Sequence, residues 1–208
     1  MKKLESTLLN MTLVLTSVAV IMGAILAYVN ELTSGPISSQ KEKALADGIK
    51  AVMVSDNIIV AKPDTVKQNG SKGKDLTYII YNVKDAQGNN LGAAVQSSTG
   101  GFGGDLKILV GFDNEGTILG YTLLEHKETP GLGAKADTWF QKGEKGDIIG
   151  KTPKEPLTVS KDGGDVDAIT ASTITSRAFL LAVNNAYNAY KSASTDGRTG
   201  ATEQEKKN

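Results

Sequence analysis

Cysteine is absent from this chain, and the sequence contains only one histidine and one tryptophan. Without cysteine there is no disulfide, thiolate metal site, iron–sulfur cluster or cysteine nucleophile, so any redox role requires a cofactor from outside the chain. The chain also has no net charge, since 23 basic residues balance 23 acidic ones. There is thus no overall positive potential that would attract nucleic acid or an acidic partner. The 208 residues suffice for one domain with a modest appendage.

The longest uncharged stretch lies near the N-terminus, from Ser6 to Asn30. Its length matches the roughly 20 residues with which a helix crosses the hydrocarbon core of a membrane. Lys2 and Lys3 precede it and Glu31 is the first charge after it, so the positive-inside rule predicts a cytoplasmic N-terminus and an extracytoplasmic remainder. A cleaved signal peptide is the alternative, but the stretch is longer than a usual signal core and no clear small-x-small site ends it. We expect an uncleaved, single-pass anchor in the cytoplasmic (inner) membrane within residues 1–30.

Two further boundaries follow from composition. Ser34-Gly35-Pro36 is expected to break the helix, and the apolar spacing after it predicts a separate juxtamembrane helix within residues 31–60. Residues 61–191 then form the expected extracytoplasmic domain. Only small, amide and charged side chains occur from residue 192 to 208, a composition that predicts a disordered tail.

Four segments of the outer domain have strand patterns. Leu76–Val83 and Leu91–Val95 predict one hairpin, and Lys107–Phe112 with Thr117–Leu124 predicts a second. The polar stretch from Ala61 to Asp75 predicts a surface connection. We therefore expect at least four antiparallel strands.

An amphipathic helix near the C-terminus is expected to cover this sheet. Its predicted buried face comprises Ile174, Ala178, Leu181, Ala182, Asn185 and Ala186, widened by Phe179, Leu180, Val183 and Tyr187. The predicted fold class is α+β: an antiparallel sheet of consecutive hairpins covered by helices, with one N-terminal transmembrane helix.

Two glycine-containing segments are candidates for ligand binding. Thr99–Gly104 has four glycines in five positions, which permits close approach of a ligand but is also ordinary in connectors. Glu125–Gly133 follows a strand; Glu128 and Thr129 present polar atoms there, ahead of a proline–glycine turn. A plain surface turn is the alternative. His126 has no evident partner, and we expect it to be solvated or simply hydrogen-bonded.

A third candidate leads into the C-terminal helix. Five hydroxyl residues occur among the seven positions from Thr170 to Ser176. The first turn of a helix offers unpaired N–H groups and the positive end of its dipole, a combination that binds phosphate. An over-supplied N-cap is the alternative, since serine, threonine and aspartate favour helix starts for their own capping bonds. The residues alone leave both interpretations open.

The segment from Asp167 to Thr173 resembles the flavinylation motif of the FMN-binding domain family found in the Rnf and Na+-translocating NADH:quinone oxidoreductase complexes. That motif is Asp, two variable residues, Ser or Thr, usually Gly, usually Ala, then the acceptor Thr. Asp167, Thr170 and Thr173 match it, while Ala171 and Ser172 stand for the usual Gly and Ala. Their side chains are small, so we expect the site still to fit.

A second motif of the same family is similar to the segment Glu128–Gly133, and Glu125-His126-Lys127-Glu128 is nearer to its Rnf version. The resemblance extends from the anchor to about Tyr190. It implies that a flavin transferase takes FMN from FAD and joins it to Thr173 through a phosphoester. The residues that it assigns to the cofactor are Thr173, Thr170 and Ser172 at the phosphate, and Glu128, Thr129, Gly131, Leu132 and Gly133 near the flavin.

The resemblance also implies a function. The chain would relay electrons as one component of an ion-translocating, Rnf-type ferredoxin:NAD+ oxidoreductase complex, being by itself an electron carrier without catalytic side chains or metal ligands. Its expected partners are the other membrane subunits and the transferase, with no nucleic acid. Two alternatives are the corresponding component of the Na+-translocating NADH:quinone reductase and a non-redox, membrane-anchored module that holds a free phosphorylated ligand.

Overall fold

The computed structural model describes residues 7–69 and 75–199. The chain divides into two compact units, residues 1–44 and 45–208, and helix α1 (Leu8–Met53) begins in the first and ends in the second. By length and composition α1 can cross a membrane: a window of 18 residues reaches a mean hydropathy of 2.3, and none of that window is buried.

The expected helix break at Ser34–Pro36 is wrong, because α1 is continuous and Pro36 lies inside it. Proline has no N–H to bond to the preceding turn, which normally interrupts a helix. Here the Ser34 hydroxyl donates to the Glu31 carbonyl at 2.9 Å, and the Ser38 hydroxyl donates to the Ser34 carbonyl at 2.7 Å. Neither bond reaches the Leu32 carbonyl, which loses its usual partner at Pro36; the long helix continues although this one backbone bond is lost.

Consecutive hairpins build a six-stranded antiparallel sheet in the second unit. The strand order is β1-β3-β4-β5-β6, with β2 also paired to β3. The four longest strands are the ones predicted from the sequence: β3 (Asp75–Asp85), β4 (Asn90–Gly100), β5 (Asp105–Phe112) and β6 (Ile118–Glu125). The α+β fold class is confirmed.

Two short strands at the sheet edge, β1 (Ile58–Val60) and β2 (Asp64–Asn69), were not predicted. The surface connection expected over residues 61–75 is therefore wrong where β2 pairs with β3. An edge strand bonds a neighbour on only one side and needs little apolar patterning. Val66 is the only large apolar residue of β2, and it packs against the core.

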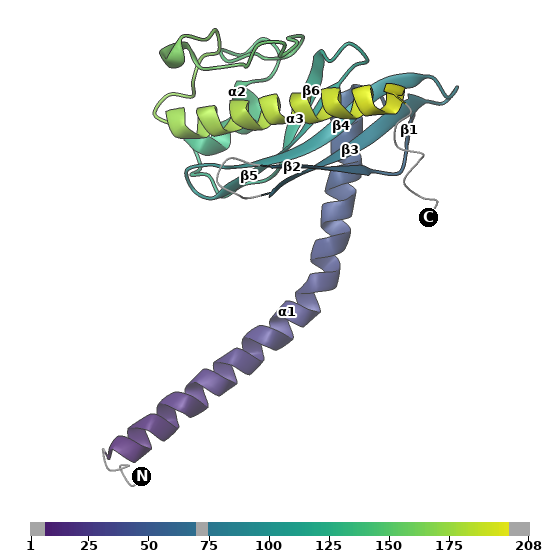
Figure 1. Cartoon of the computed structure of the whole chain (residues 1–208). Coiled ribbons are helices and arrows are strands. Elements are labelled where there is room, and N and C mark those ends of the chain that lie inside the picture. Colours follow the sequence, from purple (N-terminus) through teal and green to yellow (C-terminus); the bar gives the residue numbers. More distant parts are fainter. Residues whose placement is uncertain (1–6, 70–74, 200–208) are drawn as a thin grey trace. The chain divides into compact units, whose positions relative to one another are not determined.

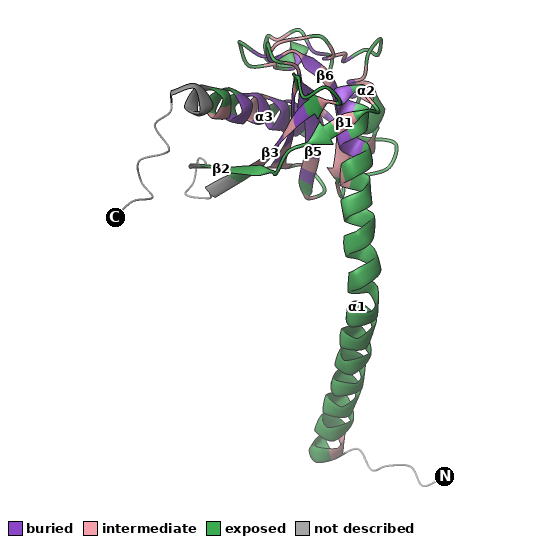
Figure 2. Ribbon diagram, turned by 90° about the vertical axis from the view of Figure 1, so that its right-hand side faces the viewer, coloured by how far each residue is buried: buried purple, intermediate pink, exposed green. Residues whose placement is uncertain are grey.

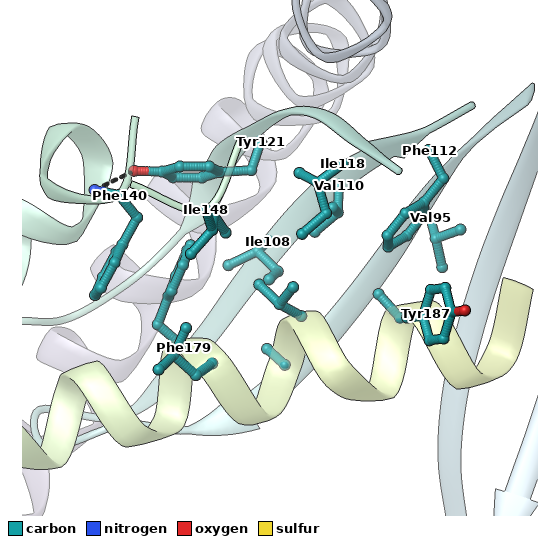
Figure 3. Close-up of a cluster of buried hydrophobic side chains, with 14 of the residues drawn as sticks. Val95, Ile108, Val110, Phe112, Ile118, Tyr121, Phe140, Ile148, Phe179 and Tyr187 are labelled. Carbon is teal, nitrogen blue, oxygen red and sulfur yellow. Dashed lines mark hydrogen bonds between the residues drawn. The ribbon is translucent and has the colours of Figure 1, made fainter. Parts of the chain in front are cut away.

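Helix α3 (Thr173–Thr199) lies across one face of the sheet (Figure 1). Its Phe179 ring stacks on Phe140 with centroids 4.3 Å apart and meets the Tyr121 ring nearly edge-on at 4.8 Å. Figure 3 shows these rings within the buried cluster. The Tyr121 hydroxyl donates to the Ala136 carbonyl and accepts from the Phe140 N–H; burial raises its pKa well above the ordinary value. The core thus extends from the sheet, through α3, to the segment that follows β6.

The buried face of α3 differs from the prediction. Ile174 and Leu181 were expected inside but are 55% and 52% exposed, whereas Thr175 and Ser176 are fully buried. These two hydroxyls make hydrogen bonds inside the protein, so their burial carries no unpaired polar atom. A hydrophobicity pattern does not predict such a face.

Helix α3 also continues past its expected end. It reaches Thr199, so the disordered tail predicted from residue 192 is wrong for residues 192–199, and the rest, residues 200–208, lies outside the described residues. The hydroxyls of Ser192 and Ser194 donate to carbonyls of the preceding turn. Extending an existing helix by a few residues needs no apolar side chains, because nucleation has already occurred.

The C-terminal end of α1 covers the opposite face of the sheet. Ile49, Val52 and Met53 pack there in a second buried cluster, and Figure 2 shows α1 exposed over most of its length and buried at this end. Gly111 and Gly120 are paired across β5 and β6. A Cβ atom on Gly111 would overlap the Val52 carbonyl oxygen, so glycine allows backbone to lie against backbone.

Between β6 and α3 the chain contains three short helical turns, η1 (Gly133–Lys135), α2 (Ala136–Trp139) and η2 (Ser160–Asp162). Asn184 of α3 holds this return segment through two hydrogen bonds of 2.9 Å with the Leu157 backbone. This attachment ties the chain just before residues 160–172 to the middle of α3.

Candidate functional site

One cavity of about 400 Å³ is lined by three segments that lie far apart in the sequence. They are the glycine-rich turn between β4 and β5, the segment after β6, and the start of α3, which are the three candidate segments predicted from the sequence. The lining residues are Phe102, Glu128, Thr129, Leu132, Gly133, Ala171, Ser172, Thr173, Ile174 and Thr175.

The Glu128 carboxylate links all three segments through hydrogen bonds. This residue is buried, with only 5% of its surface exposed. Its Oε1 accepts hydrogen bonds from the backbone N–H groups of Phe102 at 2.7 Å and Gly103 at 3.1 Å. Its Oε2 accepts one from the Thr175 hydroxyl at 2.7 Å. A buried carboxylate needs such donors, because desolvation without them is costly. Glu128 therefore fixes the glycine-rich turn and the start of α3 relative to its own segment.

Glycines around Glu128 are required by packing. A Cβ atom on Gly101 or on Gly133 would overlap the carboxylate oxygens of Glu128. Gly131 has φ +76°, a left-handed conformation that favours glycine. The Thr129 carbonyl closes the turn by accepting from the N–H groups of residues 132 and 134. These contacts explain the glycines at positions 131 and 133 without any ligand.

The hydroxyls at the start of α3 divide into two groups. Ser176 Oγ accepts from the Ile169 N–H at 2.9 Å and donates to the Ser172 carbonyl at 3.0 Å, which fastens the preceding loop to the helix. Ser172 Oγ donates to Thr175 Oγ1 at 3.0 Å and so extends the network of Glu128. Thr173 is the first residue of α3, is partly buried and lines the cavity.

Ala171 has φ 60°, in the left-handed region. For a non-glycine residue this conformation costs about 1–2 kcal/mol. The flavinylation motif usually has glycine at this position, and glycine adopts the conformation without that cost. Alanine in place of glycine therefore raises the conformational energy of the backbone at this position. Its small side chain still lines the cavity.

Six predicted residues line the cavity: Glu128, Thr129, Leu132, Gly133, Ser172 and Thr173. Gly131 and Thr170 do not, and Thr170 is exposed. Four lining residues were not assigned from the sequence: Phe102, Ala171, Ile174 and Thr175. The glycine-rich turn and the run of hydroxyls were signals for Phe102 and Thr175. His126 accepts a hydrogen bond from the Glu128 N–H at 3.3 Å.

Apolar side chains at the cavity remain open to solvent. Phe102 is 70% exposed, Ile174 55% and Leu132 41%, and one comes from each of the three segments. Large apolar groups that converge on a cavity mark a surface for an apolar ligand or partner. The hydroxyl of Thr173 and the N-terminus of α3 lie among the same lining residues. The site therefore combines an apolar surface with a helix N-terminus, the end of a helix at which an anion is stabilised electrostatically.

Comparison with known proteins identifies this domain. Residues 101–188 match the model of the FMN-binding domain family. The G subunit of the ion-translocating oxidoreductase complex of Aliivibrio fischeri is 32% identical over 193 residues, covering 89% of this chain and 91% of the relative. Its counterpart from Yersinia pestis is 36% identical over 169 residues, covering 77% and 79%. A crystal structure of the C subunit of Na+-translocating NADH-quinone reductase from Parabacteroides distasonis aligns with a TM-score of 0.46 and 20% identity, covering 74% of this chain and 94% of that one.

Residues 101–188 of the second unit thus form an FMN-binding domain, which contains all the segments around the cavity. Similarity to the curated relatives extends beyond this domain to most of the chain. The chain belongs to the family formed by the G subunits of ion-translocating oxidoreductase complexes, and it is a membrane-anchored, FMN-binding protein of electron transport. The family resemblance predicted from the two motifs is confirmed.

Proposed function

We propose that this chain relays electrons within an ion-translocating oxidoreductase complex by means of FMN joined through a phosphoester to Thr173. The observation that carries the proposal is the position of Thr173: it begins α3 and lines the same cavity as the other two predicted segments. When bound, FMN supplies reversible one- and two-electron transfer, and the ring remains chemically unmodified when the link is through the phosphate.

The lining residues fit such a cofactor. Phe102, Leu132 and Ile174 offer exposed apolar surface suited to a flat isoalloxazine ring. The first N–H groups of α3 have no partner within the helix and lie where an anion is stabilised. Ser172 and Thr175 are engaged in the network of Glu128, so their role is to hold the helix start around the phosphate. Covalent attachment also prevents loss of the cofactor by dilution outside the cytoplasm.

The proposal also covers the partners of the chain and its orientation in the membrane. As the resemblance implies, the electrons pass between ferredoxin and NAD+, the other membrane subunits are donor and acceptor, and a flavin transferase installs FMN. The charge pattern around α1 supports an extracytoplasmic flavin domain. Residues 8–30 of α1 contain no charged side chain, so ion movement is assigned to partner subunits.

Intact-mass measurement of the chain from a host that contains the transferase tests the proposal. Wild type should carry the added mass of FMN less water and should fluoresce as a flavoprotein in a denaturing gel. Thr173→Ala should lose both signals completely, because the acceptor oxygen is gone. Thr65→Ala is the matched control: it removes an exposed hydroxyl from the edge strand β2, away from the cavity, and should retain the flavin.

Two results would contradict the proposal. One is a wild-type chain that lacks the added mass in the presence of transferase and FAD; the other is a Thr173→Ala chain that keeps it. A ligand released by denaturation would instead identify a module that binds a free phosphorylated molecule.

A further inference from the structure

A lysine from outside the three cavity segments reaches the proposed attachment oxygen. Lys161, in the turn η2, lies with Nζ 3.4 Å from Thr173 Oγ1 and donates to it. Among the residues that the structure describes, its ammonium forms no ion pair with a carboxylate. Lys161 is not part of the flavinylation motif, which begins at Asp167.

The turn that carries Lys161 is held on both sides of the lysine, to α3 through Asp162 and to the loop before α3 through Ser160. Asp162 accepts two hydrogen bonds of 2.7 Å from the Arg177 guanidinium, one on each carboxylate oxygen. Ser160 Oγ donates to the Val166 carbonyl at 2.9 Å. These contacts hold the backbone on both sides of Lys161, while its side chain reaches Thr173 at the start of α3.

Arg177 is the other cation near the start of α3, but it is committed to Asp162. Its hydrogen bonds lower the pKa of the Asp162 carboxyl, which therefore stays ionised and keeps the guanidinium occupied. A bidentate arginine–carboxylate pair is also geometrically specific. Unlike Arg177, Lys161 has no carboxylate partner among the described residues, and its ammonium already donates to Thr173.

We propose that Lys161 is the positioning residue for the phosphate anion on Thr173. This inference rests on the proposed function of Thr173. In the attachment step, Thr173 Oγ1 forms a bond to the FMN phosphorus of FAD, and the phosphorus–oxygen bond to the AMP half breaks. AMP leaves with the bonding electron pair, and the hydroxyl proton passes to solvent. The phosphoester that remains carries one negative charge next to Lys161 Nζ.

The role of Lys161 follows from where that charge develops. A fixed cation beside the reacting phosphoryl oxygens lowers the barrier, since it stabilises the charge of the transition state. The lysine is exposed, so added salt weakens this attraction over about 8–10 Å. The effect of Lys161 should therefore appear in the rate of flavin attachment, should depend on salt, and should be absent from the stability of the fold.

The test measures the attachment rate by intact mass, using full-length chain in detergent with transferase and FAD. Lys161→Gln should slow attachment about tenfold at low salt, the equivalent of one charge-assisted hydrogen bond. Lys161→Arg should restore most of the rate, and the difference between wild type and Lys161→Gln should shrink as salt is added. Lys142→Gln, which removes an exposed lysine away from the lining residues, should match wild type.

Two outcomes would overturn the role of Lys161: a wild-type rate for Lys161→Gln at low salt, or a slow rate that Lys161→Arg does not restore. Unfolding temperatures of the variants should equal that of wild type, and a lowered value for Lys161→Gln would assign the lysine to the fold instead. Failure of the proposed function is recognised separately. In that case wild type gains no flavin mass, or Thr173→Ala gains it.

Discussion

Glu128 joins the walls of the cavity, because both of its carboxylate oxygens accept hydrogen bonds from protein donors. Its assignment to the flavin stays a prediction. The adjoining residues Thr129 and Leu132, together with Phe102, supply surface that remains available to a ligand.

Glu128→Gln tests this bridging role. The amide oxygen can still accept from the Phe102 and Gly103 N–H groups, but the amide nitrogen cannot accept from Thr175. We expect the free energy of unfolding to fall by about 1–2 kcal/mol. Urea unfolding in detergent, followed by the fluorescence of Trp139, measures the change, because this is the only tryptophan and its indole nitrogen donates to the Asp167 carbonyl.

Glu125→Gln is the control for Glu128→Gln. Glu125 pairs with Lys107 at 3.3 Å on the surface, and exposed pairs contribute less than about 1 kcal/mol. Equal losses in the two variants would remove the special role of Glu128.

The sequence predicted those residues of the site that belong to a recognisable motif. The motifs led to Glu128 and Thr173, and the hydroxyl run contained Thr175 without revealing that it bonds Glu128 across 47 positions. The positive φ of Ala171 was not predictable, since it arises from the surrounding loop. Lys161 had no sequence signal, because its proximity to Thr173 depends on how the return segment folds.

Between the elements, the pair Gly111–Gly120 decides how closely α1 approaches the sheet. The Val52 backbone lies against both glycines, and these positions lie on adjacent strands. Because the helix backbone itself contacts the sheet, a side chain added at either glycine has no room. Well-packed interiors tolerate added atoms poorly.

Gly111→Ala should therefore destabilise the second unit by about 1–3 kcal/mol, as expected for an overpacked site. The same urea measurement applies. Gly100→Ala is a matched control, since a Cβ atom there meets nothing within 4 Å, and it should change stability by less than about 0.5 kcal/mol. An unchanged Gly111→Ala chain would mean that α1 can shift away without loss.

Helices and strands were predictable from the sequence where their hydrophobic residues recur with a regular period. The four long strands have alternating or β-branched patterns; three were predicted nearly to their ends, whereas β4 continues five residues past the predicted Leu91–Val95. The edge strand β2 was missed because its residues are polar. The break at Pro36 was predicted from a general rule for proline, whereas the 46-residue helix continues through it and loses only one backbone bond. The face of α3 was misassigned because buried hydroxyls look polar in a sequence.

At the scale of the whole molecule, the boundary between the two units falls inside α1, at residue 44. Residues 45–53 belong to the flavin-binding unit, where Ile49, Val52 and Met53 are buried. Each such side chain contributes about 1.5–3 kcal/mol when removed from water. Together they are comparable with the net stability of a typical domain.

A chain that begins at Leu45 should consequently be soluble and unfold cooperatively, whereas one that begins at Asp56 should aggregate or unfold at a much lower temperature. Gel filtration and thermal unfolding of the two truncated proteins give the comparison. Identical unfolding temperatures would show that the second buried cluster adds nothing to stability.

The network of Glu128 also orders events in time. The partner of Glu128, Thr175, is synthesised late, because it lies at the start of the last helix. The same holds for Ala178, whose carbonyl accepts a hydrogen bond from Thr99, 79 positions earlier. Contacts of such long sequence separation form late in folding. Under the proposed function, a nascent chain has no acceptor until Thr173 is made and no cavity until α3 has docked. Attachment of the flavin would then distinguish finished, folded proteins from incomplete ones.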